Sequence, residues 1–302
     1  MKSSAFQYEL PEDLSSALKL LNSEDLDILP LAGGQSLMPM MNFRVAQPDI
    51  LIDLNKIDSL KNIIIEGNFV RIGSMVRYYE LEQSEIIQKH FPLIVHVIPY
   101  IAHSAIRNRG TLGGSVSLAD PAAEMPSILI ALNASIELSS LNSTRSVNAE
   151  DFFKGIFETD RKSNELVTSI NIPISSTPKK FGFYEVTRRH GDYAIAGSVV
   201  TSDGGQDNFD DTRVVLFAVS TKPMRLPKSE AALNGQNFNN QDSISEAIDA
   251  VSGNSFERDL HNDEITKESL AKVSLKRAIG GLNGWYQNNN SNCKWRRVHK
   301  YS

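Results

Sequence analysis

The chain has 302 residues, of which 41% are hydrophobic and 22% charged, and its formal net charge is -5. These values are ordinary for a folded globular protein, exclude a mainly disordered chain, and allow two domains. The negative net charge does not favour a nucleic acid as partner. Cys293 is the single cysteine, so the chain can form no internal disulfide and cannot ligate an iron–sulfur cluster or a cysteine-bound zinc ion by itself.

The first ten residues, MKSSAFQYEL, lack the apolar core of a signal peptide. The most apolar window, residues 92–102, is too short to span a bilayer. The sequence therefore predicts a cytoplasmic protein without a membrane span.

The first half of the chain mixes helical and strand periods. A helical spacing of apolar residues begins at Leu14, directly after Glu12 and Asp13, and predicts an amphipathic helix with acidic residues in its first turn. Ser36 is placed to cap a helical segment that runs through Arg44. Further helices are expected at 76–84, 86–101 and 122–133, and strands at 27–32, 49–54, 69–73, 135–141 and 163–174.

The second half begins with the best candidate linker, residues 173–180, which holds two prolines among polar residues. Strands are expected at 181–187, 193–201 and 212–221, helices at 247–251 and 267–282, and a mobile asparagine-rich stretch at 287–292. Because helices and strands do not alternate cleanly, the chain is expected to have an α+β fold rather than a doubly wound α/β sheet.

Two short loops with paired glycines give the main indication of a binding site. The first consists of Ala32, Gly33, Gly34, Gln35 and Ser36, and the second of Thr111, Leu112, Gly113, Gly114 and Ser115. Glycine permits positive φ and close approach of a ligand, so two such loops can hold a long anion, such as a dinucleotide pyrophosphate, with backbone N–H groups. Each loop is also compatible with a purely structural turn, and neither matches GxGxxG or the Walker pattern.

Charged and aromatic residues near these loops have two interpretations each. Arg107 and Arg109 either balance phosphate charge or form a solvated surface pair. Asp120 either accepts hydrogen bonds from sugar hydroxyls or caps a helix ahead of Pro121. Tyr193 either stacks on a planar ring or begins a strand as a half-buried residue.

The sequence contains no motif for metal-dependent or serine hydrolysis. None of the six histidines forms HExxH or another closely spaced ligand pair, and no GxSxG occurs. No metal site is therefore expected on this chain.

Four segments carry a resemblance to a known family. They are AGGQSLMPMMNFR at 32–44, IRNRGTLGGSVSLADPAAEMP at 106–126, FFKGIFET at 152–159 and RRHGDYAIAG at 188–197. Over roughly residues 1–285, the chain resembles the medium, FAD-binding subunits of the molybdenum hydroxylases, the carbon monoxide dehydrogenase and xanthine dehydrogenase family. The resemblance implies three regions. They are a two-subdomain FAD-binding domain of the vanillyl-alcohol-oxidase (PCMH) type at 1–177, a smaller α+β domain like that of the carbon monoxide dehydrogenase flavoprotein at 178–285, and a tail at 286–302.

The same resemblance assigns roles around the flavin. Both glycine loops would wrap the FAD pyrophosphate, Asp120 would lie near the ribityl chain, and Tyr193 would lie against the isoalloxazine ring in a loop shaped by Asp192. Two positions depart from the family. Ser115 stands where asparagine is commoner, and Glu185 stands where a lysine often points toward the flavin. A carboxylate at position 185 would not stabilise an anionic reduced flavin.

The function implied by the resemblance is electron transfer within a larger complex, so no catalytic acid–base residue is expected on this chain. A large subunit would hold the molybdopterin cofactor and oxidise the substrate, and a small subunit would carry two [2Fe–2S] clusters. Electrons would reach FAD on this chain and leave for an external acceptor, in an assembly built as a dimer of heterotrimers. Two alternatives stay open: a self-contained flavin oxidase of the same fold, and a non-catalytic nucleotide-binding assembly module.

Overall fold

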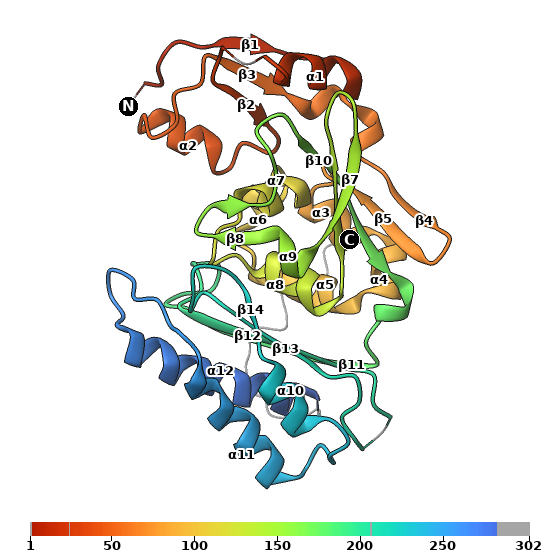
Figure 1. The fold of residues 1–302 in the computed structure, drawn as a ribbon, viewed down its shortest axis with the longest axis vertical. Coiled ribbons are helices and arrows are strands. Elements are labelled where there is room, and N and C mark those ends of the chain that lie inside the picture. Colours follow the sequence, from red (N-terminus) through yellow and green to blue (C-terminus); the bar gives the residue numbers. More distant parts are fainter. Residues whose placement is uncertain (1, 24, 206, 283–302) are drawn as a thin grey trace, which may run out of the picture.

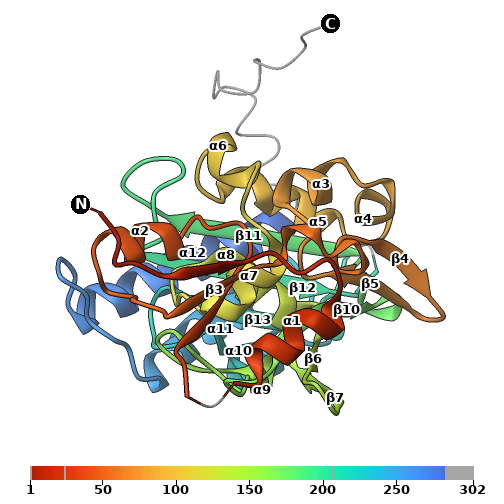
Figure 2. The same cartoon turned by 90° about the horizontal axis from the view of Figure 1, so that it is seen from above.

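The computed structural model describes residues 2–23, 25–205 and 207–282. Figure 1 shows three parts arranged along the longest axis: an N-terminal part, a middle part, and a C-terminal part. Seen from above, the three parts lie over one another (Figure 2). The expected tail at 286–302, the asparagine-rich stretch at 287–292 and Cys293 all lie outside the described residues.

The N-terminal part is a small parallel sheet in the order β1-β3-β2 with two helices. It contains β1 (Gln7–Glu9), α1 (Leu14–Leu21), β2 (Ile28–Leu31), α2 (Leu37–Asn42) and β3 (Ile50–Asp53). The expected acidic first turn of α1 is wrong, because Asp13 is instead the N-cap. Its carboxylate accepts a hydrogen bond from the Ser16 N–H at 2.8 Å, which satisfies a helix donor that would otherwise lack a partner.

The middle part is an antiparallel sheet in the order β4-β5-β10-β6-β7, with helices packed against it. In chain order it contains η1 (Leu54–Lys56), η2 (Asp58–Leu60), β4 (Ile63–Glu66), β5 (Phe69–Gly73), α3 (Tyr78–Gln83), α4 (Glu85–His90), α5 (Pro92–Val97), η3 (Ile98–Tyr100), α6 (Ser104–Arg107), α7 (Leu112–Leu118), α8 (Glu124–Ala131), β6 (Ser135–Ser139), β7 (Thr144–Asn148), α9 (Ala149–Phe152), β8 (Phe153–Gly155), β9 (Glu158–Thr159), β10 (Leu166–Pro173) and η4 (Ile174–Ser176). Alternation along β5 buries Val70 and Ile72 in the core, while Arg71 on the other face pairs with Glu137 at 2.7 Å.

The single helix expected at 86–101 is wrong, because the segment folds as α4, α5 and η3. The break falls at Phe91, whose φ of -135° and ψ of 62° are not helical. Pro92 follows at the first position of α5, where its missing N–H costs no hydrogen bond. The apolar face of α5 is buried in the main core.

The C-terminal part is an antiparallel sheet in the order β11-β12-β13-β14 with helices on one face. It contains β11 (Lys180–Val186), β12 (Ala196–Ser202), β13 (Arg213–Phe217), β14 (Met224–Arg225), α10 (Pro227–Leu233), α11 (Gln241–Asp249), η5 (Ala250–Gly253) and α12 (Glu264–Leu282). Helix α12 packs closely on β11, because a Cβ on Gly182 would lie 1.8 Å from the Ala278 carbonyl oxygen. The mixed architecture of the whole chain confirms the expected α+β class.

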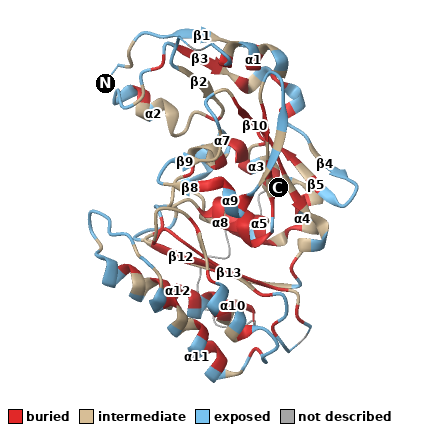
Figure 3. Ribbon diagram, viewed as in Figure 1, coloured by how far each residue is buried: buried red, intermediate tan, exposed pale blue. Residues whose placement is uncertain are grey.

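The other face of this sheet lies on helix α8 of the middle part. Figure 3 shows α8, β12 and β13 buried at the centre of the molecule. On β11, Phe183 belongs to the core that contains α8, whereas Tyr184 packs against the core beneath α12. By the strand alternation, Glu185 therefore shares the face of Phe183 and points toward the middle part.

Among the described residues, no helix is long and apolar enough to cross a membrane.

Candidate functional site

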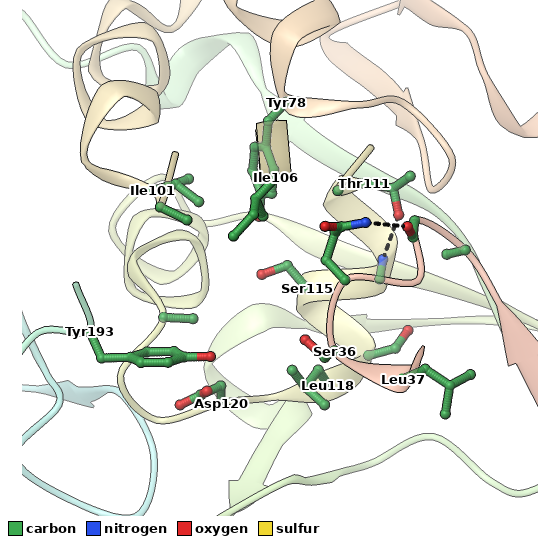
Figure 4. A pocket seen from close by; sticks show the side chains of 18 of the residues that line it. Ser36, Leu37, Tyr78, Ile101, Ile106, Thr111, Ser115, Leu118, Asp120 and Tyr193 are labelled. Carbon is green, nitrogen blue, oxygen red and sulfur yellow. Dashed lines mark hydrogen bonds between the residues drawn. The ribbon is translucent and has the colours of Figure 1, made fainter. Parts of the chain in front are cut away.

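A cavity of about 940 Å³ lies where the three parts meet. Its walls come from the first glycine loop, the end of β5, the second glycine loop with α7, the loop before β12, and residues 259–262. Twelve of the thirteen residues expected at the site line it, and Figure 4 shows several of them around the opening. Leu112 is the exception, because its side chain is buried in the main core.

The two glycine loops touch each other, and their glycines make this possible. A Cβ on Gly33 would lie 2.3 Å from the Arg109 carbonyl oxygen, and a Cβ on Gly113 would lie 2.3 Å from the Ser74 Cβ. Gly34 has a φ of +73°, which L side chains rarely adopt. At these three positions, the packing and backbone of the chain itself therefore require glycine, whether or not a ligand is bound.

The first loop presents a row of backbone donors to the cavity. The N–H groups of residues 33–37 have no acceptor within hydrogen-bond distance in the described part of the chain, and all five residues line the cavity. The Gln35 side-chain amide braces the loop by donating to the Gly33 carbonyl oxygen at 3.0 Å. Successive free N–H groups at the start of a helix form a concave site that favours an anion.

Ser36 does occupy the N-cap position of α2, but its hydroxyl makes no capping hydrogen bond, so the expected cap is wrong. The reason is its backbone, which is helical with φ -103° and ψ -45°, whereas a capping side chain needs an extended backbone. Helix α2 also ends at Asn42, before Arg44. The Ser36 hydroxyl is therefore available to the cavity.

The second loop differs, because its own fold uses its backbone donors. Thr111 caps α7 by accepting from the Gly114 N–H at 3.1 Å, and the Leu112 and Gly113 N–H groups donate to the carbonyl oxygens of residues 76 and 74. The Ser115 N–H donates to the Thr111 carbonyl oxygen. Side chains of this loop, such as that of Ser115, line the cavity instead.

Two buried hydroxyls beside the loops lack a partner. Ser74 Oγ and the Tyr78 hydroxyl have no hydrogen-bond partner in the described part of the chain, and both residues line the cavity. Burial raises the pKa of Tyr78, so its hydroxyl stays protonated and able to donate. An unpaired buried hydroxyl costs about 1–3 kcal/mol, so these two atoms fit a ligand that supplies polar oxygens. No motif in the sequence indicates either residue.

Asp120 and Tyr193 lie together at one end of the cavity (Figure 4). One Asp120 oxygen accepts from the Ala122 N–H at 2.9 Å, which forms a turn rather than a helix cap, because α8 begins only at Glu124. Tyr193 is 71% exposed and lies three residues before the start of β12, so it does not begin a buried strand. Asp192 beside it is also exposed.

Arg107 and Arg109 do not share one role, whether balancing phosphate charge or forming a solvated surface pair. The Arg107 guanidinium donates to the backbone carbonyl oxygens of residues 101 and 102 at 3.0 and 2.9 Å. Arg109 is exposed, and its carbonyl oxygen faces Gly33. Arg107 therefore holds the chain beside the cavity.

Glu124 and Glu185 are buried carboxyls that no sequence motif places at the site as a pair. Glu124 is the first residue of α8 and lines the cavity; burial, and then the Asp120 charge, raise its pKa to about 7. Burial and the Glu124 charge raise the pKa of Glu185 to about 8. The expectation of a charged carboxylate at position 185 is therefore corrected, because a carboxyl with this pKa is mostly protonated, and uncharged, at pH 7.

The sequence analysis also did not predict that residues 259–262 line the cavity, because they are far along the chain from the two glycine loops. Lys267 on α12 is buried and its ammonium group lies 2.7 Å from the Asp259 carboxylate. The same group donates to the carbonyl oxygens of Ile195 and Ala218, both at 2.8 Å. Within the described ranges, no group of three or more side chains could hold a metal ion.

Comparison with known proteins gives two family matches that together cover most of the chain. Residues 4–175 match the family described as the FAD binding domain in molybdopterin dehydrogenase. The chain belongs to this family. Residues 182–282 match the CO dehydrogenase flavoprotein C-terminal domain. This FAD-binding chain is thus an oxidoreductase subunit, and the expected PCMH-type fold with a smaller C-terminal domain is confirmed. The precise division at 177/178 stays a prediction.

Individual relatives match over most of their own length. The chain is 40% identical to the glyceraldehyde dehydrogenase medium chain of Sulfolobus acidocaldarius, over 78% of this chain and 83% of that protein. It is 34% identical to the nicotine 6-hydroxylase medium subunit of Paenarthrobacter nicotinovorans, over 92% and 98%. Among solved structures, carbon monoxide dehydrogenase from Hydrogenophaga pseudoflava matches with a TM-score of 0.88 and 34% identity, over 93% and 98% of the two chains.

Proposed function

We propose that this FAD-binding chain is the electron-transfer subunit of a multi-subunit molybdenum hydroxylase. It would receive electrons from [2Fe–2S] clusters on a small partner subunit and pass them through FAD to an external acceptor. The observation on which the proposal chiefly rests is the row of unpaired N–H donors at 33–37 beside a cavity. When bound, FAD would supply the ability to collect electrons singly and release them in pairs.

The residues around the cavity suit the separate parts of FAD. The N–H groups of the first loop would bind the pyrophosphate, as main-chain donors do at other phosphate sites. Ser115, Ser74 and Tyr78 would donate hydroxyl hydrogen bonds to the remaining oxygens. The second Asp120 oxygen, which the turn leaves free, would accept from the ribityl hydroxyls. Tyr193 would lie against the isoalloxazine ring.

The relatives support the proposed partners. Several relatives are named as medium chains or subunits, and a matching solved structure is a Cu,Mo-CO dehydrogenase with a TM-score of 0.89. We place the molybdopterin cofactor on a large partner subunit and the iron–sulfur clusters on a small one. The single cysteine supports this division, because a cluster needs several thiolates. A dimer of heterotrimers in the cytoplasm completes the proposal.

The test is to purify the full chain, add FAD, remove the excess, and record the absorbance. A flavin spectrum close to one FAD per chain is expected, with no reduction by substrate until the partner subunits are added. Substrate-driven reduction by the isolated chain would instead support the self-contained oxidase. A colourless protein that still binds phosphates would support the assembly module.

A further inference from the structure

Lys267 on α12 binds three separate segments of the chain through its buried ammonium group. The group lies 2.7 Å from the Asp259 carboxylate and donates to the carbonyl oxygens of Ile195 and Ala218, both at 2.8 Å. An ammonium group has three N–H donors, so these contacts use all of them. Only 4% of Lys267 is exposed, and the exclusion of water strengthens each contact. Lys267 does not itself line the cavity, so its influence on a bound ligand passes through these segments.

The bond to Ile195 holds the end of the loop that carries Tyr193. This loop joins β11 to β12, and both Tyr193 and Ile195 line the cavity. The Ile195 N–H donates to the Val186 carbonyl oxygen at 2.8 Å, while the Ile195 carbonyl oxygen accepts from Lys267. The chain is thus bonded on both sides of Ile195, two residues after Tyr193. Because the Tyr193 side chain is mostly exposed, its place depends on this backbone rather than on close packing of its ring.

The bond to Ala218 reaches the chain beside Asp120 through one further hydrogen bond. Ala218 directly follows β13 and has a φ of +62°, which residues with a Cβ rarely adopt. Its N–H donates to the Pro121 carbonyl oxygen at 2.8 Å, and its carbonyl oxygen accepts from Lys267. Pro121 follows Asp120, which lines the cavity. Lys267 therefore holds the turn that ties β13 to the chain next to Asp120.

Tyr193 and Asp120 belong to different parts of the fold, although they lie together at one end of the cavity (Figure 4). Tyr193 precedes β12 of the C-terminal sheet, whereas Asp120 lies between α7 and α8 of the middle part. Their separation therefore depends on bonds that cross between these parts. The Lys267 ammonium is bonded to the chain beside Tyr193 directly, and to the chain beside Asp120 through Ala218.

We propose that Lys267 is a positioning residue that sets the places of Tyr193 and Asp120 around the flavin. This inference rests on the proposed function, in which Tyr193 lies against the isoalloxazine ring and Asp120 accepts hydrogen bonds from the ribityl hydroxyls. Lys267 acts on the backbone that carries these two residues and forms no bond to the cofactor. Without its ammonium group, the carbonyl oxygens of residues 195 and 218 lose their common donor, and Tyr193 and Asp120 are no longer held at a fixed separation.

The fluorescence of bound FAD reports directly on the place of Tyr193. A phenol ring in contact with an isoalloxazine ring quenches the flavin fluorescence, and the quenching falls steeply as the rings separate. A loss of stability does not change this signal while the chain remains folded. The fluorescence therefore separates a positioning role of Lys267 from a purely stabilising one.

The first measurement compares the fluorescence of FAD-loaded variants after free FAD is removed. Tyr193→Leu should raise the fluorescence, and Lys267→Met should reproduce most of that rise. Lys272→Met, which removes only a surface pair from the same helix, should match the wild type. In a Tyr193→Leu background, Lys267→Met should add almost nothing, because both changes act through the same ring. Wild-type fluorescence in Lys267→Met, or additive effects in the double variant, would overturn the proposal.

The second measurement is the affinity for FAD, determined by equilibrium titration. Asp120→Ala and Lys267→Met should each weaken binding about tenfold. Together they should weaken it by clearly less than about a hundredfold, because Lys267 acts partly through Asp120. Lys272→Met should bind FAD as the wild type does. A double variant weakened by the full product of the two single effects would overturn the link to Asp120.

Lys267→Gln is the second variant, to be used where Lys267→Met does not fold. Its amide retains N–H donors without the charge, so both readouts should move in the same direction but by less. Folded Lys267→Gln with wild-type fluorescence and affinity would overturn the proposal.

The outcomes also separate this inference from the proposed function. A wild-type chain that binds no FAD would overturn the proposed function and, with it, the role of Lys267. Bound FAD whose fluorescence is the same in Tyr193→Leu would overturn the placement of Tyr193. A response to Tyr193→Leu without any response to the Lys267 variants would overturn the positioning role of Lys267 alone.

Discussion

At the residue scale, the glycines of the two loops illustrate what sequence can and cannot reveal. The paired glycines predicted that a ligand approaches the backbone closely at these loops, and both loops do line the cavity. The physical reason for the glycines was only partly anticipated, because Gly33 and Gly113 pack against backbone or side chain of another segment. Such a requirement depends on which segments meet, and a local motif carries no information about that.

Replacing Gly113 with alanine should destabilise the fold. The new Cβ would lie 2.3 Å from the Ser74 Cβ and 2.7 Å from its carbonyl oxygen, so the loop or the end of β5 must shift. We expect the free energy of unfolding to fall by about 1–3 kcal/mol, measured by denaturant titration. Gly205→Ala is the matched control, because nothing lies within 4 Å of the position that its new Cβ would take, and it should change stability little. Equal stability of the two variants would contradict the close packing.

Glu185 should make the stability of the chain dependent on pH. The pKa of Glu185 is about 8 in the folded chain, raised from 4.5. The contribution of this residue to the free energy of unfolding is therefore fully present below about pH 4.5 and is lost as the pH rises through about 8. From pH 5 to 9, Glu185→Gln should therefore gain about 1–3 kcal/mol in the free energy of unfolding relative to the wild type. Thermal or denaturant unfolding across this range measures the effect, and parallel pH profiles would contradict it.

At the element scale, helix α12 holds residues 259–262, which form one wall of the cavity. The sequence predicted most of this helix, at 267–282, and it predicted the strands of the C-terminal sheet nearly in place. It did not predict α10, β4 or β7, which are short and lack a clear period. Nor did it predict the role of Lys267, because a lysine on a helix is ordinarily solvated.

Lys267→Met should loosen residues 257–262. The change removes an ion pair and two charged hydrogen bonds from a buried position and leaves two carbonyl oxygens without a partner. We expect the free energy of unfolding to fall by about 2–4 kcal/mol, and hydrogen exchange at 257–262 to accelerate. Lys272→Met on the same helix removes only a surface pair with Glu268, so it should cost less than about 1 kcal/mol. Similar exchange in both variants would contradict this anchoring role.

At the scale of the whole molecule, the two family segments share a core. Helix α8 and residues of β11, β12 and β13 belong to one hydrophobic cluster. Sequence periodicity and resemblance indicated two domains and their order, but the extent of the contact between them depends on tertiary packing. All three parts of the fold contribute residues to the cavity. Of these residues, the sequence predicted only the two glycine loops and the segment around Tyr193.

Residues 1–177 produced alone should therefore expose the apolar face of α8. We expect this fragment to bind a hydrophobic dye strongly and to unfold at a lower denaturant concentration than the full chain, because it lacks the sheet that covers α8. A fragment as stable as the full chain, without dye binding, would show that the two segments fold independently.

The most direct test of FAD binding by the first loop is the Ser36→Asp variant. Ser36 makes no capping hydrogen bond, so its replacement removes none and α2 should be retained, while the new carboxylate would compete with a phosphate for the N–H groups of residues 33–37. Measured by equilibrium titration, the affinity for FAD should fall about 10- to 100-fold. Ser245→Asp, at an exposed position of α11, should leave it unchanged. Wild-type affinity in Ser36→Asp would contradict binding of the pyrophosphate at this loop.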